Sequence, residues 1–290
     1  GSREGHTLVG ARCAACKAIV PILPRRIVPY LPRRLVVAVA VTLVVGGVAT
    51  ACTGQSLAPS TAGPSALAAP SALPAPTTSP YTFDDEFDGS TLGPAWGFHL
   101  KCCGITTPDP TLATVAGGML HLSVSNVGGT WFGTAVDTAS SFSQLYGTFS
   151  ARIQIPKGPG LWPAFWLYAS GSSEIDAAEV CANPIGGNRG NDASLLHTTL
   201  HWPGDGKQAA DTREPDLSQG WHVYSVDWRP DHISWSLDGM PIWTFSDAAE
   251  IPARPLPVIL DLGLGGWWCG PADASDNGAQ MLVDWVRVLP

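Results

Sequence analysis

The sequence predicts an all-β domain built as a sandwich of two antiparallel sheets. From about residue 81 onward, short runs rich in β-branched and aromatic residues alternate with clusters of Gly, Pro, Asn and Asp, which is the pattern of strands and turns. No helical spacing of apolar residues persists over about three turns. All 12 Trp residues lie after position 90, so this part of the chain has ample material for a packed core.

The chain begins with a segment, residues 1–52, that predicts an export signal. Two Pro-Arg-Arg repeats precede Leu35–Ala51, an apolar run of 17 residues without charge, and the small residues Ala49 and Ala51 suit a signal peptidase site. Cys52 follows directly, an arrangement that resembles a bacterial lipoprotein signal. The alternatives are a plainly secreted protein and an uncleaved membrane anchor. Each places the body outside the cytoplasm, with the membrane reached only through the leader or a lipid anchor.

Residues 53–80 are predicted to form a tether, because they are mainly Ala, Pro, Ser, Thr and Gly without charge. The remaining residues, 81–290, have the length of a single domain. Residues 1–52 hold seven bases and one acid, which leaves nine bases, 23 acids and a formal charge of −14 for the rest. A surface this acidic argues against nucleic acid as a partner, because a phosphate backbone attracts basic residues. We expect the domain to act as a monomer.

Eight segments of the body carry the clearest strand pattern, each bounded by turn-forming residues. They are Met119–Val124, Gly147–Ile155, Ala164–Tyr168, Ser194–Trp202, His222–Trp228, His232–Leu237, Pro257–Leu264 and Met281–Val288. Asp238-Gly239 supplies the positive φ values of a tight hairpin turn between Ile233–Leu237 and Ile242–Phe245. Many short antiparallel strands at this spacing indicate a sandwich.

Three acidic residues, Glu174, Asp176 and Glu179, fall within six positions of a domain in which charged residues are otherwise sparse. On a helix, Glu174 would point away from the other two. On a strand, Glu174 and Asp176 share a face, and Glu179 joins them only if one extra residue is inserted. A β-bulge at Ala177-Ala178 supplies that residue, and such bulges occur next to active sites.

Carboxylates on one face repel each other, so their grouping needs a cation, a proton or a substrate. A catalytic pair satisfies this need. One Glu stays ionised as a nucleophile, the other holds a proton as the acid, and the Asp between them adjusts both. A solvated acidic edge and a calcium site are the alternatives that the spacing leaves open.

The motif Glu174–Glu179, preceded by Gly160–Leu167, resembles glycoside hydrolase family 16, and in particular its laminarinase-like members. Further matching motifs follow in order, so the resemblance covers essentially the whole body. They are Phe83–Gly89, Tyr146-Gly147, Pro156–Gly158, Leu200–Trp202, Trp221–Trp228 with the Asp238-Gly239 hairpin, and Met281–Val288. The departures are Ala177-Ala178 in place of a bulkier pair and Ser172-Ser173 in place of a common Gly. They put in doubt which glucan is bound.

The resemblance implies a β-jelly-roll with a long concave cleft, in an exported enzyme that cuts internal β-1,3 or mixed β-1,3/1,4 glucan linkages by a retaining double displacement. It implies that Glu174 attacks the anomeric carbon, that Glu179 protonates the leaving oxygen and then activates water, and that Asp176 tunes the nucleophile. This chemistry requires no cofactor, and the expected partner is a β-glucan polysaccharide. A non-catalytic glycan-binding protein, and a transglycosylase or galactan hydrolase of the same family, are the alternatives.

Aromatic side chains near the acidic motif are expected to bind sugar rings. The candidates are Trp162, Trp166, His201, Trp202, Trp267 and Trp268, whereas Trp228, Trp235 and Trp285 are expected to pack in the core. His201 matches a family histidine beside the catalytic strand, where it would bond to substrate or to Asp176, and a satisfied core histidine is the alternative. The resemblance further implies a structural calcium ion held by Glu86, the backbone of Gly118, and Asp284.

Four cysteines follow Cys52, and in an oxidising compartment they allow two disulfides. Adjacent cysteines rarely pair with each other. We therefore expect Cys102 and Cys103 to pair with Cys181 and Cys269, in either order. Free buried thiols are the alternative.

Overall fold

The computed structural model describes residues 79–99, 104–171, 173–181, 193–204 and 206–290. The predicted leader with Cys52, almost all of the predicted tether, and Cys102 and Cys103 lie outside the described residues. Within the described part of the chain, no helix is both long and apolar enough to span a membrane.

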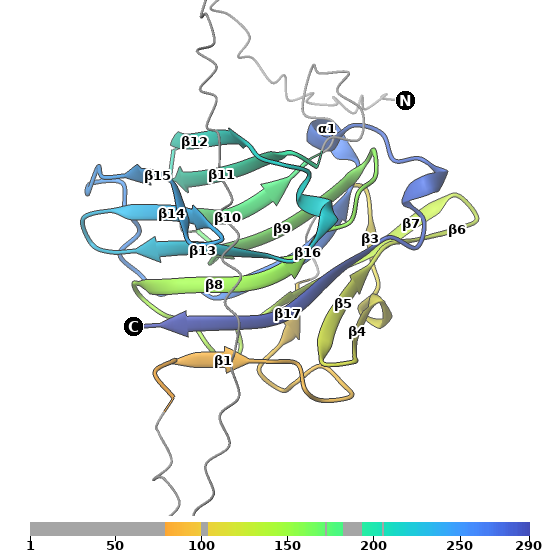
Figure 1. Cartoon of the computed structure of the whole chain (residues 1–290), viewed down its shortest axis with the longest axis horizontal. Helices are drawn as coiled ribbons and strands as arrows, with labels where there is room; N and C mark the ends of the chain where they lie inside the picture. Colours follow the sequence, from red (N-terminus) through yellow and green to blue (C-terminus); the bar gives the residue numbers. More distant parts are fainter. Residues whose placement is uncertain (1–78, 100–103, 172, 182–192, 205) are drawn as a thin grey trace, which may run out of the picture. The chain divides into compact units, whose positions relative to one another are not determined.

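The first of two sheets has eight strands (Figure 1). In spatial order they are β15 (Met240–Phe245), β14 (Ile233–Leu237), β13 (His222–Trp228), β8 (Gly147–Gln154), β17 (Gln280–Leu289), β5 (Met119–Ser123) and β4 (Ala113–Ala116), with β1 (Phe83–Asp85) paired to β17. The pairings in this sheet are antiparallel. Strand β8 illustrates why such segments form strands of this sheet: its residues alternate between buried and half-buried along its whole length.

The second sheet has nine strands and carries the acidic motif at its centre. In order they are β12 (Gly206–Arg213), β11 (Leu195–Trp202), β10 (Glu174–Val180), β9 (Leu161–Tyr168), β16 (Val258–Leu264), β7 (Thr130–Asp137) and β2 (Gly97–Phe98), with β3 (Thr107–Pro108) and β6 (Ser125–Val127) paired to β7. Helical turns are short: η1 (Pro110–Leu112), η2 (Leu217–Gln219), α1 (Gly266–Cys269) and η3 (Ala274–Asp276). The predicted all-β sandwich is confirmed.

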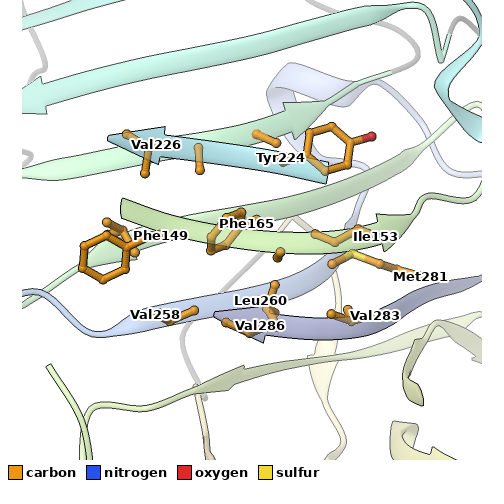
Figure 2. Close-up of a cluster of buried hydrophobic side chains, with 14 of the residues drawn as sticks. Phe149, Ile153, Phe165, Tyr224, Val226, Val258, Leu260, Met281, Val283 and Val286 are labelled. Carbon is orange, nitrogen blue, oxygen red and sulfur yellow. The ribbon is translucent and has the colours of Figure 1, made fainter. Parts of the chain in front are cut away.

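The core lies between the two sheets, where side chains from β8, β13 and β17 meet those from β9 and β16 (Figure 2). Phe149 and Val286 come from the first sheet and Phe165 and Leu260 from the second, and all four are fully buried. Each such side chain contributes about 1.5–3 kcal/mol to the free energy of unfolding. Strand β16 is buried along its whole length, so both of its faces are covered. One face lies in the core, and the other lies on the opposite surface of the sheet.

The predicted strands and hairpin are present. Strand β9 begins at Leu161, three residues before the predicted start, and the other seven predicted strands differ from the observed bounds by at most one residue at either end. At the predicted hairpin, Asp238 has φ 52° and Gly239 has φ 75°, the pair of positive values that a tight turn between β14 and β15 requires. Trp228 and Trp235 are fully buried as expected, whereas Trp285 is half-buried under the guanidinium of Arg287.

The cysteine pairing differs from the prediction, because Cys181 bonds to Cys269. Strands β10 and β16 are both antiparallel to β9 and therefore run in the same direction. Their carboxyl ends meet at one edge of the sheet, which brings Cys181, directly after β10, to Cys269 in the turn of helix after β16. Sequence spacing alone did not reveal this neighbourhood. The disulfide therefore ties the end of the acidic strand to α1.

Candidate active site

The acidic motif lies on β10, and the predicted bulge is present. Asp176 pairs with Thr199 of β11, whereas Glu179 pairs with His197, so Ala177 and Ala178 together oppose a single residue of β11. The pairing with β9 shifts over the same stretch. The extra residue turns Glu179 to the face that Glu174 and Asp176 already share.

A tryptophan of the other sheet supports the bulge from below. Trp235 of β14 is fully buried and its Nε1 donates a hydrogen bond to the backbone oxygen of Asp176, at 2.8 Å. A bulge interrupts the regular ladder, so its carbonyl needs a partner from elsewhere. The indole supplies that partner.

Above the bulge, the three acids contact one histidine and one tryptophan. His201 Nε2 lies 3.1 Å from Asp176 Oδ2 and 3.8 Å from Glu174 Oε1. Trp162 Nε1 donates to Glu179 Oε1 at 2.9 Å. His201 thus bonds to Asp176, as one of its two expected roles required, and its side chain is 38% exposed, so it is no core histidine.

The pKa of each acid in the motif is raised, but not equally. Burial raises the pKa of Glu174, and the charge of His201 and a hydrogen bond with Asp176 oppose this rise. Burial, together with the charge of Glu174, holds the pKa of Asp176 well above its ordinary value. Burial and the charge of Asp176 do the same for Glu179, against the lowering effect of the Trp162 bond. Burial thus favours the protonated form of Glu179 more strongly than that of Glu174.

A cavity of about 480 Å³ opens over these residues, on the side of β11 and β12. Its lining is Trp162, Glu174, Glu179, His197, Thr199, His201, Lys207, Ala209, Asp211 and Trp268. A cavity of this size accommodates a small part of a polymer, and its openings are lined by both aromatic and hydrogen-bonding side chains. An acid, a base and an aromatic wall thus share one concave site.

Comparisons with known proteins decide the family. Residues 106–287 match the model of the Glycosyl hydrolases family 16. The chain belongs to this family. Its two-sheet fold is the one that the sequence resemblance implied.

Among the family's members, the chain is 33% identical over 156 residues to the Endo-1,3-1,4-beta-glycanase EglC of Rhizobium meliloti (strain 1021), which covers 52% of this chain and 31% of that protein. The chain thus spans about a third of this relative's length. It is 30% identical over 239 residues to the Glucan endo-1,3-beta-glucosidase of Cryptopygus antarcticus, with 67% of this chain and 84% of the relative covered. The laminarinase from Rhodothermus marinus has a similar structure, with a TM-score of 0.62, 25% identity, and 72% and 96% of the two chains covered.

Of the sugar-binding residues expected in this family 16 domain, three line the cavity: Trp162, His201 and Trp268. Trp268 reaches it because Gly265 and Gly266, at φ 68° and 83°, turn the chain sharply from β16 into α1. The centroid of its ring lies 4.9 Å from that of the Trp162 ring and 4.8 Å from that of the His197 ring. Nothing is described of the side chain of Trp267.

Two further tryptophans that were expected to bind sugar, Trp166 and Trp202, do not line the cavity. Trp166 stands on the same face as the acids, since it pairs with Asp176 across the strands, and its Nε1 donates to Asp261. Trp202 differs from the prediction: its ring lies 5.8 Å from that of Phe245 and packs against the core. The reason is the alternation of β11, which sends His201 to the cavity and the next residue to the opposite face.

Sequence reasoning missed five polar residues of this face. They are His197, Thr199, Lys207, Asp211 and Asp261. His197 Nδ1 lies 2.6 Å from Asp211 Oδ1, and its Nε2 is buried without a hydrogen-bond partner among the described residues. His197 stands four positions before His201 on one strand, so its place on the same face could have been predicted.

Two groups of residues bear on metal binding. Glu174, Asp176 and His201 hold ligand atoms within 4.8 Å of one another, so the acidic cluster itself could accept a cation. The expected calcium ligands are engaged otherwise: Glu86 accepts from Arg287 at 2.6 Å, and Asp284 from Arg152 at 2.6 Å. Gly118 lies in the turn between β4 and β5. A calcium ion would have to displace both arginines, and the structural calcium stays a prediction.

Proposed function

We propose that the domain is an endo-acting β-glucanase that hydrolyses internal β-1,3 or mixed β-1,3/1,4 glucan linkages with retention of configuration. The observation that carries the proposal is the bulge of β10, which brings Glu174 and Glu179 together on the face that lines the cavity. Burial raises the pKa of Glu179 more strongly than that of Glu174, which suits an acid beside a nucleophile. The family and the glucanase names of its similar members support the choice of substrate.

In the first step, a carboxylate oxygen of Glu174 forms a bond to the anomeric carbon while the glycosidic C–O bond breaks, and Glu179 gives its proton to the leaving oxygen. In the second step, Glu179 takes a proton from water as the water oxygen bonds to the same carbon, and the bond to Glu174 breaks. Asp176, held by His201 at 3.1 Å, orients and tunes Glu174. Two inversions at one carbon give net retention.

The test is the release of reducing ends from laminarin and lichenan. We expect activity in the wild type and a loss of about 10³-fold or more in Glu174→Gln, because the amide cannot form the covalent intermediate. Glu250→Gln, at a glutamate that does not line the cavity, serves as the matched control and should retain full activity. NMR of the first-formed anomer reports retention.

Two outcomes would contradict the proposal. Equal activity of Glu174→Gln and the wild type would remove the nucleophile. Binding to glucans without turnover on a broad polysaccharide panel would instead indicate a glycan-binding protein. Mass spectrometry of the products distinguishes hydrolysis from transfer, since transfer yields oligosaccharides longer than the substrate.

A further inference from the structure

Asp261 is an acid on the same face of the second sheet as Glu179, and the proposed mechanism does not use it. It lies on β16 and is only 2% exposed. In the sheet it pairs with Ala164 of β9, and Ala164 in turn pairs with Glu179. Residues paired across strands point to the same face, so Asp261 and Glu179 share the cleft face with one methyl group between them.

One oxygen of Asp261 is held and the other is not. Oδ1 accepts a hydrogen bond from Trp166 Nε1 at 2.7 Å. Oδ2 is buried and has no hydrogen-bond partner within the described part of the chain. An ionised carboxylate with a bare, buried oxygen is costly, so the neutral acid is favoured. Burial raises the pKa of Asp261 to about 8, even though the Trp166 bond and the backbone N–H of Gly263 lower it.

The electrostatic surroundings of Asp261 are mostly acidic. On its other side it pairs with Ala135 of β7, so small side chains flank it in both directions. The titratable groups that face it from the neighbouring strands are Glu174, Asp176 and Glu179 of β10, Tyr168 of β9, and Asp137 of β7 with its partner His99. The charges of Glu179 and Glu174 raise the pKa of Asp261, and its own charge raises that of Asp176.

We propose that Asp261 is a positioning residue of the cleft, which anchors the indole of Trp166 and places a fourth, proton-holding carboxyl group beside the acid/base Glu179. The proposal rests on the function proposed above. Strands lie about 4.8 Å apart, so two strands separate the backbones of Asp261 and Glu179 by about 10 Å. At an effective dielectric constant of about 20, one charge at that distance changes the other group's pKa by about one unit. The coupling is mutual: the charge of an ionised Glu179 raises the pKa of Asp261, and an ionised Asp261 would in turn keep Glu179 protonated to higher pH.

Two substitutions separate the two roles. Asp261→Asn keeps an oxygen that accepts from Trp166 and removes the ionisation. We expect the alkaline limb of kcat/KM on laminarin to move down by about 0.5 to 1 pH unit, with KM unchanged. Asp261→Ala removes the acceptor, and we expect KM to rise about 5- to 10-fold because the indole of Trp166 is no longer held in place. Asp276→Asn is the matched control, because Asp276 is also a fully buried acid with an unpartnered oxygen but lies in η3 and not on a strand beside Glu179. Its pH profile should follow the wild type.

A pH profile of Asp261→Asn that superimposes on the wild type would overturn the coupling to Glu179. An unchanged KM in Asp261→Ala would overturn the anchoring of Trp166. A purely structural role would lower stability in both variants without moving the alkaline limb.

An infrared titration keeps the proposal testable if Asp261→Asn does not fold or if the wild type cleaves no glucan. In the variant Glu174→Gln/Asp176→Asn/Glu179→Gln/Asp276→Asn, neither the three acids of the motif nor the buried Asp276 can contribute a carboxylic acid band. A band that persists above pH 6 supports a proton-holding Asp261, and loss of the band by pH 6 contradicts it. Failure of the glucanase function itself appears separately, as an inactive wild type.

Discussion

Glu179 is the residue whose proton its neighbours control most closely. Burial and the charge of Asp176 raise its pKa, and the hydrogen bond from Trp162 lowers it. The sequence predicted both residues, but it assigned Trp162 only to sugar stacking. The indole bond to Glu179 could not be predicted, because it depends on how far the bulge turns the glutamate toward β9.

Trp162→Phe isolates this hydrogen bond. Phe keeps an aromatic face, but it cannot donate to the ionised form of Glu179, so the pKa of Glu179 rises further. We expect the alkaline limb of kcat/KM to move to higher pH, opposite in direction to Asp261→Asn, with kcat reduced about 10-fold as the acid loses its orientation. The measurement is a pH series of initial rates on laminarin. Trp285→Phe, on strand β17 of the other sheet, is the control, and a limb that stays in place in Trp162→Phe would contradict the assignment.

At the scale of the element, the link between β10 and α1 holds one wall of the cavity. Cys181 lies two residues beyond Glu179, and Cys269 is next to Trp268, whose ring packs on those of Trp162 and His197. The disulfide thus connects the strand that carries the acid to the turn that carries an aromatic wall. We expect it to contribute both stability and geometry.

Cys181→Ser/Cys269→Ser tests this link. The bond closes a loop with a sequence separation of 88, for which the chain-entropy model gives about 4.6 kcal/mol of stabilisation. In a domain of this size we expect Tm to fall by about 8 to 15 °C. We also expect KM on laminarin to rise several-fold at a temperature where the variant is folded, because Trp268 is freer. Differential scanning calorimetry and steady-state kinetics measure the two effects, and an unchanged KM would limit the bond to stability alone.

The strands that could be predicted from the sequence differ in their amino-acid pattern from those that could not. Strands such as β8 and β13 alternate apolar and polar residues, which is the signal of a sheet with one face in the core. Strand β12 was missed because its residues, Gly206–Arg213, include no branched apolar side chain, and as an edge strand it pairs only with β11. Strand β7 was missed although the pair Gly128-Gly129, both at positive φ, marks the hairpin before it.

The candidate site divides in the same way. The carboxylates and their bulge could be predicted, since a period of two forces the extra residue. His197 and Asp211 could not be paired in advance, because the strand that carries Asp211 gave no signal. Asp261 was hidden in an apolar run that read as buried strand, and only the sheet order places it beside the acids.

At the scale of the whole molecule, the acidity of the body has two components. The residues after position 52 carry a formal charge of −14, which disfavours polyanionic partners and suits a neutral polysaccharide. Asp176, Glu179 and Asp261 are acids whose raised pKa values keep them protonated longer than the sequence suggests. The effective charge near neutral pH is therefore smaller than the formal one, and it grows as these groups ionise.

This titration predicts how stability depends on pH. Asp261 has a folded pKa of about 8 against an ordinary value of 3.8, so between these values the folded state binds the extra proton and stability falls as pH rises. Asp176 and Glu179 act in the same direction. Asp216 pairs with Lys157, and its pKa is lowered to about 2, so it acts in the opposite direction. Its contribution to stability is lost only as pH falls from about 4 toward 2. Stability should therefore be greatest near pH 4 to 5.

We expect Tm to be about 5 to 10 °C lower at pH 9 than at pH 5, which corresponds to a loss on the order of 2–4 kcal/mol. Thermal unfolding at pH 5, 7 and 9 measures it. Surface repulsion would give the same sign, but salt screens exposed charges more strongly than buried ones, so the difference should persist at high ionic strength. Asp261→Asn should reduce it, because one of the buried protons no longer has to be lost. A Tm that rises from pH 5 to pH 9 would show that the buried carboxyl groups of the cleft are already ionised at neutral pH.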